Sequence, residues 1–396
     1  MDNFSLKSMN YEVIVIGLGA MGSAAVYQLS KQKIKVLGID QFSPPHAFGS
    51  THGETRVTRQ AIGEGEEYVP LTLRTYEIFR EIEAKTNTDL LTITGGLIMS
   101  KSSGKANLHG NDGFIETTVS TAKKFGVKHH LLSADEIAKE FPQFNLDGDE
   151  TGYFEDEMGF LRPENCVSAQ LELAEKQGAE IKRNERVLEI KHDINSVEII
   201  TDKGNYKAEK LIISAGAWVN NFIEKPREDL FKIYRQVFYW FDIADNYAKF
   251  KLSNFPIFIW EFGRWENDFV YGFPAIEGKN GGFKIATETY LETTNPDKVN
   301  REVSQKEINE IYEKYVGNRI KGVSRKTIKT ATCLYTNLPN AKFLIDYLPE
   351  NKRIIVASPC SGHGFKHSAA IGEILAELVF QGKSTIDISE FCFDKF

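Results

Sequence analysis

A glycine-rich run near the start of the chain has the spacing of a phosphate-binding turn. Gly17, Gly19 and Gly22 fit the pattern Gly-x-Gly-x-x-Gly, and Asp40 follows about 20 residues later. Glycines let the backbone approach a pyrophosphate at the positive end of a helix, and a carboxylate ending the next strand accepts hydrogen bonds from ribose hydroxyls. These residues predict a dinucleotide site. The motif leaves FAD and NAD open, whereas the acidic residue disfavours NADP.

Two arginines could form a site for an anionic group. Arg56 and Arg59 lie three residues apart, so on a helical turn they would share one face. Two guanidinium groups that face one pocket suit bidentate recognition of a carboxylate or a phosphate. The alternative from the residues alone is an ordinary pair of surface arginines.

A second glycine-rich run, Ser361 to Lys366, follows an apolar strand that ends near Ser358. Small residues and a lysine at the start of a helix favour an anion site, and a plain turn with a solvated Lys366 is equally compatible with the pattern. Another set of small residues around Gly216 also follows a predicted strand. Such residues allow close approach of a ligand or of backbone.

The first glycine run lies inside a βαβ unit. Tyr11–Ile16 is an apolar, β-branched run too short for a helix, which predicts a buried strand. Ala24–Lys31 is typical of a helix and Lys35–Asp40 of a second strand. Strand, glycine turn, helix and strand within about 30 residues imply parallel pairing with a right-handed crossover.

Further elements of this type lie elsewhere in the chain. The apolar spacing predicts a helix over 66–85, and a hairpin of strands 197–201 and 206–213. Near the end of the chain we expect a strand over 353–357 and a helix from about 366 to 380.

The middle of the chain has a different composition. Residues 227–326 are rich in aromatic side chains in short alternating segments, which predicts an antiparallel sheet with an aromatic face. A helix in this part opens with a capping box at Ser304 and Glu307. Residues 101–113 are polar and glycine-rich, so a surface loop is expected. The α/β part is therefore predicted to be discontinuous, with the aromatic sheet inserted into it.

Composition indicates a folded protein with a large core. The chain has 396 residues, a length that suggests two or three domains, and 41% of them are hydrophobic. The formal net charge is −7. We expect no nucleic-acid partner, because the chain is mildly acidic and clusters of Lys and Arg supply most of the affinity for phosphates. No apolar stretch approaches the ~20 residues that span a bilayer, and the start lacks the pattern of a signal peptide. We therefore expect a cytoplasmic protein without a membrane partner.

The cysteines are sparse. Cys166, Cys333, Cys360 and Cys392 form no Cys-x-x-Cys pair, so neither a zinc ribbon nor a disulfide scaffold is expected, and no metal site is predicted. From the residues alone, Cys333 is interpreted as a buried structural cysteine.

Several long motifs, in order along almost the whole chain, carry a family resemblance. The chain resembles the monomeric sarcosine oxidase and N-methyltryptophan oxidase family of FAD-dependent amine oxidases. The matching segments are Gly17–Gly22, Pro44–Arg59, Gly63–Gly65, Tyr68–Leu71, Tyr271–Pro274, Cys333–Thr336, Phe343–Asp346 and Ser361–Lys366.

The resemblance implies an FAD cofactor that is attached covalently through the sulfur of Cys333. A thiolate is needed for that linkage, so a low thiol pKa at Cys333 would help. The residues expected to bind the cofactor are Gly17, Gly19, Gly22, Asp40, Gly216, Cys333, Gly362, Gly364 and Lys366.

The resemblance also implies the substrate site. Arg59 and Lys366 would bind the substrate carboxylate. Arg56 and Lys284 would lie against the flavin faces, with Lys284 promoting electron transfer to O₂. The remaining expected site residues are Tyr271 and Tyr335 on the cavity wall and His52 beside the flavin.

One position departs from the family pattern. The family segment Lys-x-x-x-His, whose histidine lines the amine pocket, is here Lys284-Ile285-Ala286-Thr287-Glu288. If Glu288 takes the place of the histidine, a carboxylate faces the amine and favours a cationic group. The alternative is that Glu288 turns to solvent.

The resemblance completes the expected fold class, which is α/β. A Rossmann-type FAD-binding domain is expected over 9–92, 151–225 and 327–396. An inserted substrate domain built on an antiparallel sheet is expected over 93–150 and 226–326.

The expected function is oxidation of a secondary, N-methyl amino acid to an imine, with O₂ reduced to hydrogen peroxide by a monomeric enzyme. One alternative is a D-amino-acid or glycine oxidase-like enzyme acting on a primary amine. Others are an amine dehydrogenase with another electron acceptor and a non-catalytic flavoprotein. The presence together of Arg56, Lys284 and Cys333 disfavours the last.

Overall fold

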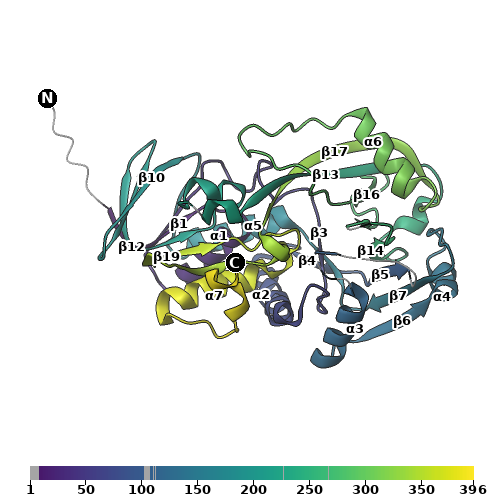
Figure 1. Ribbon diagram of the computed structural model, residues 1–396, viewed down its shortest axis with the longest axis horizontal. Coiled ribbons are helices and arrows are strands. Elements are labelled where there is room, and N and C mark those ends of the chain that lie inside the picture. The colour runs from purple at the N-terminus through teal and green to yellow at the C-terminus, as the bar shows by residue number, and fades with distance from the viewer. Residues whose placement is uncertain (1–8, 102–107, 110, 112, 226, 266) are drawn as a thin grey trace.

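The structure is a computed structural model that describes residues 9–101, 108, 109, 111, 113–225, 227–265 and 267–396. Two large sheets lie toward opposite ends of the long axis of the molecule (Figure 1). Part of the loop expected over 101–113 lies outside the described residues. No helix in the described part of the chain is both long and apolar enough to cross a membrane.

The first sheet is built around the predicted βαβ unit. Strand β1 (Met9–Ile16) pairs in parallel with β2 (Val36–Ile39), and α1 (Ala20–Lys31) connects them. The strand residues 13–16 and 36–39 are buried because helices cover the sheet, which explains their nearly continuous apolar character. Both strands and the helix confirm the predictions.

The rest of the first sheet comes from distant parts of the chain. The predicted hairpin is present and antiparallel, whereas the strand near the C-terminus adds to the sheet in parallel. The order is β10-β11-β12-β1-β2-β9, with β19 on β12 and β18 on β19. The bounds are β9 Glu180–Lys182, β10 Val187–His192, β11 Val197–Thr201, β12 Asn205–Ile213, β18 Ile345–Leu348 and β19 Asn351–Ala357.

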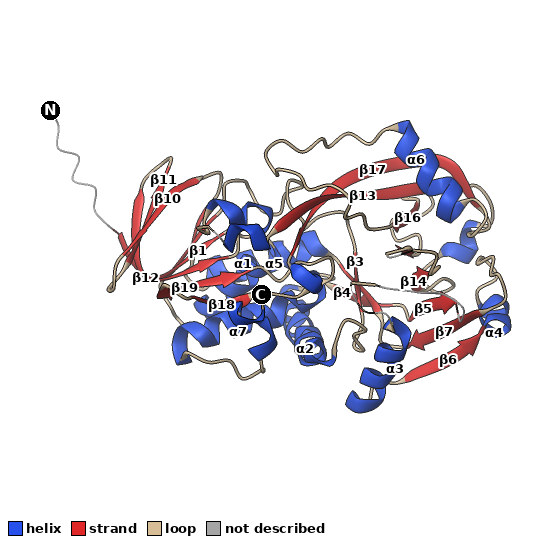
Figure 2. Cartoon of the chain, in the orientation of Figure 1, coloured by secondary structure: helices blue, strands red, loops and turns tan. Residues whose placement is uncertain are grey.

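Helices cover this sheet and form its larger core (Figure 2). Helix α1 packs against α5 (Pro163–Lys176) and α7 (Ser368–Gln381), and α7 also packs against α2 (Val69–Thr86). Helix α2 confirms the predicted helix, with Pro70 in its first turn, where no backbone N–H is needed.

The second sheet contains the aromatic segments. Its order is β17-β13-β16-β15-β14-β5-β7-β6. Neighbouring strands are antiparallel, as predicted, except that β14 pairs in parallel with β5. The bounds are β5 Gly96–Lys101, β6 His129–Ser133, β7 Glu150–Glu155, β13 Lys232–Ile243, β14 Ile257–Glu261, β15 Phe269–Gly272, β16 Phe283–Ala286 and β17 Val323–Asn337.

Three helices accompany the second sheet: α3 (Phe114–Phe125), α4 (Ala134–Glu140) and α6 (Gln305–Ile311). The predicted capping box opens α6, because Ser304 and Glu307 satisfy each other's backbone N–H groups. Interlocking aromatic rings such as Phe144, Phe258 and Trp260 fill the core beneath.

A small three-stranded sheet lies between the two large ones, with order β3-β8-β4, and all of its pairs are antiparallel (Figure 2). The bounds are β3 Arg56–Thr58, β4 Leu91–Ile93 and β8 Gly159–Leu161.

The division into two domains stays a prediction, and two of its expected boundaries fall inside strands. The boundary between 150 and 151 falls inside β7, and that between 326 and 327 falls inside β17, which pairs with β13 from Val323 to Asn337. A strand is one hydrogen-bonded unit, so both strands belong entirely to the second sheet. Cys333 therefore lies on the second sheet.

Candidate active site

One continuous cavity runs between the carboxyl ends of the first sheet and the aromatic sheet. One end is lined by Gly17, Gly19, Asp40 and Gly216, and the other by Arg59, Glu64, His109, Tyr271, Glu288, Tyr335 and Lys366. The glycine loop at 362–364 and Arg56 also line it. The fold thus brings most of the predicted site residues to one cavity.

The first glycine turn packs tightly on itself and against Ser214, which directly follows the neighbouring strand β12. A Cβ on Gly22 would lie 1.8 Å from the carbonyl oxygen of Gly17, and one on Gly17 would lie 2.6 Å from that of Ser214. Gly17 also has a φ of +84°, which favours glycine. A Cβ on Gly19 would meet only Thr51 Oγ1, at 3.5 Å. Gly17 and Gly22 therefore shape the turn, whereas Gly19 leaves its cavity side open.

Asp40 is buried at the end of β2 and lines the cavity. Its two carboxylate oxygens accept hydrogen bonds from the backbone N–H groups of Leu18 and Phe42, both at 2.8 Å. These bonds tie the glycine turn to the strand that follows. Each carboxylate oxygen has a second lone pair, so Asp40 retains acceptor capacity for a ribose hydroxyl.

The second glycine loop leads into α7. A Cβ on Gly364 would lie 1.6 Å from the carbonyl oxygen of Pro359, so only glycine fits there. Lys366 is 3% exposed, and its Nζ donates to the carbonyl oxygen of His363 at 2.7 Å. The interpretation of Lys366 as a solvated lysine is therefore wrong, because the loop folds its side chain inward.

Arg56 and Arg59 do not share a helical turn. Residues 56–58 form β3, and Arg59 follows directly after it. The prediction of a helical turn is wrong because Arg56–Thr58 pair with β8 in the small sheet. Both arginines nevertheless line the cavity. Arg56 donates to the carbonyl oxygens of Ser50 at 2.6 Å and Thr55 at 2.8 Å.

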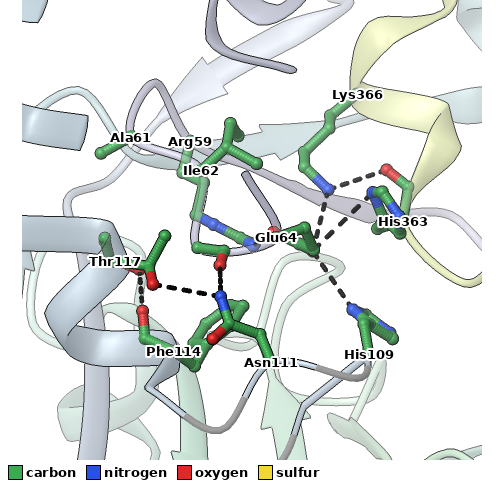
Figure 3. A network of polar contacts seen from close by, with 12 residues as sticks. Arg59, Ala61, Ile62, Glu64, His109, Asn111, Phe114, Thr117, His363 and Lys366 are labelled. Atoms are coloured by element: carbon green, nitrogen blue, oxygen red, sulfur yellow. Dashed lines mark hydrogen bonds and ion pairs between the residues drawn. The ribbon is translucent and has the colours of Figure 1, made fainter. Parts of the chain in front are cut away.

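Glu64 is the centre of a buried ionic network (Figure 3). Its Oε2 lies 2.5 Å from Arg59 Nη2, and its Oε1 lies 3.6 Å from Lys366 Nζ and 3.2 Å from His109 Nδ1. Burial alone would raise the pKa of Glu64, but Arg59 and Lys366 hold it well below its usual value. Burial lowers the pKa of Lys366 to about 7, although Glu64 opposes that shift.

His109 continues this network to Glu288. Its Nε2 lies 2.9 Å from Glu288 Oε2, which also accepts a hydrogen bond from the hydroxyl of Tyr290. Burial would lower the pKa of His109, but Glu288 and Glu64 raise it to about 9. The Glu288 side chain is only 4% exposed, so the alternative that it turns to solvent is wrong.

Asn111 lies two residues after His109 and bonds to the segment that carries Glu64. Its side-chain Nδ2 donates to the carbonyl oxygen of Gly63 at 2.5 Å and to Thr117 Oγ1 at 3.1 Å. Since Gly63 precedes Glu64, the segment that carries His109 is tied to the segment that carries its partner (Figure 3).

Three site residues were missed by sequence reasoning: Glu64, His109 and Tyr290. The segment Gly63–Gly65 is one of those that carry the family resemblance, but the resemblance assigned no role to Glu64. His109 lies 45 residues from Glu64 and 179 residues from Glu288, so no local spacing relates them.

Two phenolic groups face each other on the aromatic side of the cavity. Tyr271 on β15 and Tyr335 on β17 have hydroxyl oxygens 3.3 Å apart. Burial raises the pKa of both hydroxyls, so both stay neutral near pH 7.

Lys284 lies behind the cavity wall rather than on it. Its Nζ donates to the carbonyl oxygens of Gly53 at 2.5 Å and Thr55 at 3.0 Å, and lies over the ring of Phe238 at 4.5 Å. Burial, with Arg56 nearby, lowers its pKa well below the usual value. The ammonium is thus held by carbonyl dipoles and aromatic faces.

His52 also lies behind the wall, where its ring packs edge-on against Phe238. Burial, with Arg56 nearby, lowers its pKa to about 3, so the imidazole is neutral near pH 7. No hydrogen-bond partner for its buried Nε2 occurs among the described residues.

Cys333 is fully buried in a cluster with Phe238, Trp240 and Tyr335. Its Sγ lies 3.8 Å from Arg56 Nη2 and 3.5 Å from the carbonyl oxygen of Ser50. Burial raises the pKa of the thiol to about 11, although Arg56 opposes the shift. The expectation of a low thiol pKa at Cys333 is therefore not met in this structure.

Comparison with known proteins identifies the family of this chain. Residues 12–378 match the family described as FAD dependent oxidoreductase. Monomeric sarcosine oxidase from Bacillus sp. (strain B-0618) is 37% identical over 397 residues, covering 98% of this chain and 97% of that protein. N-methyl-L-tryptophan oxidase from Yersinia pestis (strain Pestoides F) is 32% identical over 393 residues, covering 98% of this chain and all of that protein.

A solved structure supports the fold. The open form of NikD, described as an unusual amino acid oxidase, has a TM-score of 0.82 at 22% identity, over 97% of this chain and 98% of that one. At that identity the likeness concerns the fold alone.

The fold and the matched family define a flavin-dependent oxidoreductase. The chain belongs to the FAD dependent oxidoreductase family and, within it, to the group of monomeric sarcosine oxidases and N-methyl-L-tryptophan oxidases. The predicted resemblance and fold class are confirmed. The individual roles assigned to site residues stay predictions.

Proposed function

We propose that this protein is an FAD-dependent oxidase of secondary, N-methyl amino acids. The observation that carries this proposal is that Arg59 and Lys366 already converge on one buried carboxylate, that of Glu64. Two cations that hold a carboxylate inside the protein can hold the carboxylate of an amino acid in the same way. Relatives that are 37% and 32% identical over 98% of this chain are named for oxidation of N-methyl amino acids.

The glycine end of the cavity suits the cofactor. Helix α1 begins at Ala20 without a side-chain cap, so the N–H groups of its first turn can bind phosphate oxygens. Gly19 leaves space beside them, and an added Cβ on Gly216 would meet no atom within 4 Å. Gly17, Gly19, Gly22, Asp40, Gly216, Gly362, Gly364 and Lys366 would thus hold FAD. When bound, FAD would supply the acceptor for the hydride equivalent that is removed from the carbon attached to the amine nitrogen.

The remaining groups bind and orient the substrate. Its carboxylate would bind beside Glu64, within reach of Arg59 and Lys366, and its amine would lie on the side of Tyr271 and Tyr335. The buried cations Arg56 and Lys284 would stabilise negative charge that develops when O₂ is reduced to hydrogen peroxide. Neutral His52 adds no further charge beside them.

A peroxide assay over a substrate panel tests this function. N-methyl-L-amino acids, glycine, D-amino acids, cyclic imino acids and amines without a carboxylate should be compared. We expect the N-methyl amino acids to be turned over best and the amines without a carboxylate to be poor substrates. Peroxide from primary D-amino acids or glycine alone would instead identify a D-amino-acid or glycine oxidase-like enzyme. Turnover with an artificial dye but without peroxide would identify a dehydrogenase.

The covalent linkage is proposed for Cys333. Its Sγ is within 3.8 Å of Arg56, whose positive charge favours the thiolate against the effect of burial. Acid-precipitated protein should stay yellow, and Cys333→Ser should release its flavin into the supernatant. Cys166→Ser, on α5, is the matched control and should stay yellow. A colourless precipitate from the unaltered protein would contradict the linkage.

The role of Lys284 toward O₂ is tested by separating the two half-reactions. Lys284→Met should slow reoxidation of the reduced enzyme by about 100-fold or more and change its reduction much less, because the cation is needed where charge develops. Equal slowing of both would exclude the role.

We further propose that the protein works as a monomer in the cytoplasm, on a small amino acid and O₂, without nucleic acid or membrane. Its relatives include enzymes named monomeric sarcosine oxidase, which supports the first point. Sedimentation of the purified protein at several concentrations tests it.

A further inference from the structure

The cavity wall beside Gly362 carries a compact polar cluster formed by Glu288, His109 and Tyr290. Oxygen Oε2 of Glu288 accepts from His109 Nε2 and from the hydroxyl of Tyr290. A Cβ on Gly362 would lie 2.9 Å from His109 Nε2, 2.9 Å from the Tyr290 hydroxyl and 3.1 Å from Glu288 Oε2. The three polar atoms therefore converge on one point, and the Glu288 carboxylate is held in one orientation.

The other oxygen of Glu288 is left for a ligand. Every hydrogen bond that Glu288 makes with the described residues uses Oε2, so Oε1 keeps its acceptor capacity. Glu288 lines the cavity together with Tyr271 and Tyr335. An acceptor on this wall loses free energy when a ligand excludes water from it and offers it no donor.

The negative charge of Glu288 is already balanced. His109 contacts a carboxylate through each ring nitrogen, Glu64 through Nδ1 and Glu288 through Nε2. Both nitrogens must donate to such acceptors, which is possible only for the protonated imidazolium. An acceptor paired with an adjacent cation attracts a hydrogen-bond donor without attracting an additional positive charge.

We propose that Glu288 and His109 determine the substrate specificity of this cavity. Oε1 of Glu288 accepts a hydrogen bond from an O–H or N–H group on the substrate side chain, and His109 prevents selection of a second cationic group. The inference rests on the proposed oxidase function, and it replaces the expectation that Glu288 favours a cationic substrate.

Three nearly isosteric substrates test the inference. N-methylserine carries a neutral donor, N-methyl-2-aminobutyrate an apolar methyl group, and N-methyl-2,3-diaminopropionate a cationic amine at the same place. We expect kcat/KM for the hydroxyl side chain to exceed that for the methyl side chain by about tenfold. The cationic side chain should show no advantage over the hydroxyl.

Two variants assign the effect to its atoms. In Glu288→Gln, the amide oxygen must face the two donors, so the amide NH₂ replaces Oε1 and a donor replaces an acceptor. The preference for the hydroxyl side chain should disappear. In His109→Gln, the charge of Glu288 is no longer balanced, and the cationic side chain should gain about tenfold relative to the hydroxyl. Glu292→Gln, at an exposed position four residues along the chain, is the matched control and should leave both ratios unchanged.

Binding provides a second readout that does not depend on turnover. The corresponding 2-methoxy acids carry oxygen in place of the reacting nitrogen, and their Kd can be measured from the change in flavin absorbance. We expect the hydroxyl side chain to bind more tightly than the methyl side chain, and the cationic side chain to bind no more tightly than the hydroxyl. Equal kcat/KM values and equal Kd values for the hydroxyl and methyl side chains would overturn the inference and leave the oxidase function intact. Absence of peroxide with every N-methyl amino acid of the substrate panel would overturn the proposed function, and the Kd series would still judge the inference.

Discussion

The two ends of the cavity are built in different ways. The glycine end relies on backbone: Gly17, Gly19 and Gly22 lie within six consecutive residues and act through the absence of a side chain. The ionic end relies on side chains: Arg59, Glu64, His109, Glu288 and Lys366 come from four separate segments and act through charge.

This difference determines how each end tolerates change. A backbone turn fails when any atom is added, because neighbouring peptide groups cannot move aside. A buried ionic network fails when one charge is removed, since the partner charge is left without compensation. It can recover when the partner is neutralised too.

The largest effect is expected at the glycine end. Gly22→Ala places a Cβ 1.8 Å from the Gly17 carbonyl oxygen, which should lower the free energy of unfolding by about 4 kcal/mol and prevent FAD uptake. Gly19→Ala meets only Thr51 Oγ1 at 3.5 Å, so it should keep its stability and bind FAD less tightly. Urea unfolding and the flavin-to-protein ratio measure the two effects. Equal loss of stability in both variants would contradict the distinct roles assigned to the two glycines.

A somewhat smaller effect is expected at the ionic end. Arg59→Met leaves the Glu64 carboxylate buried without its guanidinium partner and should cost about 3 kcal/mol of unfolding free energy. The double variant Arg59→Met/Glu64→Gln should regain part of that loss, because the Glu64 carboxylate no longer lacks its guanidinium partner, although Lys366 loses its carboxylate partner. Urea unfolding of the single and double variants measures the recovery. A double variant no more stable than the single one would show that charge compensation is not what Arg59 contributes.

The smallest effect concerns pH. Burial lowers the pKa of Lys366 to about 7 against the opposing effect of Glu64. A bound carboxylate favours the ammonium form, so binding is strongest below this pKa and weakens as the pH rises through it. The Kd of propionate should therefore rise by up to about tenfold per pH unit between pH 7.5 and pH 8.5.

Lys366→Arg provides the control for this pH dependence. Arginine stays protonated throughout that range, so the Kd of propionate should stay constant if the variant still binds it. Titration of the flavin absorbance with propionate at each pH measures both proteins. The same slope in both would assign the titration to another group.

The extent of sequence-based prediction differs between the two ends. Strand β1, helix α1 and strand β2 follow from local apolar patterns and a glycine motif, and the structure confirms them. Arg56 and Arg59 both line the cavity, and their role as an anion site stays a prediction. They do not lie on a helical turn, because pairing of β3 with β8 overrides the local pattern. The interpretation of Glu288 lacked its partner, since His109 comes from a polar segment expected to be a surface loop.

The sequence by itself determined the family, the dinucleotide turn and the residues that carry charge, because these depend on residue types at short spacing. Only the tertiary structure decided which charges meet. Lys366 reaches Glu64 from the loop before α7, and His109 reaches it from the segment before α3 (Figure 3). Coulombic partners are selected by distance in space and by burial, and neither is encoded in the spacing along the chain.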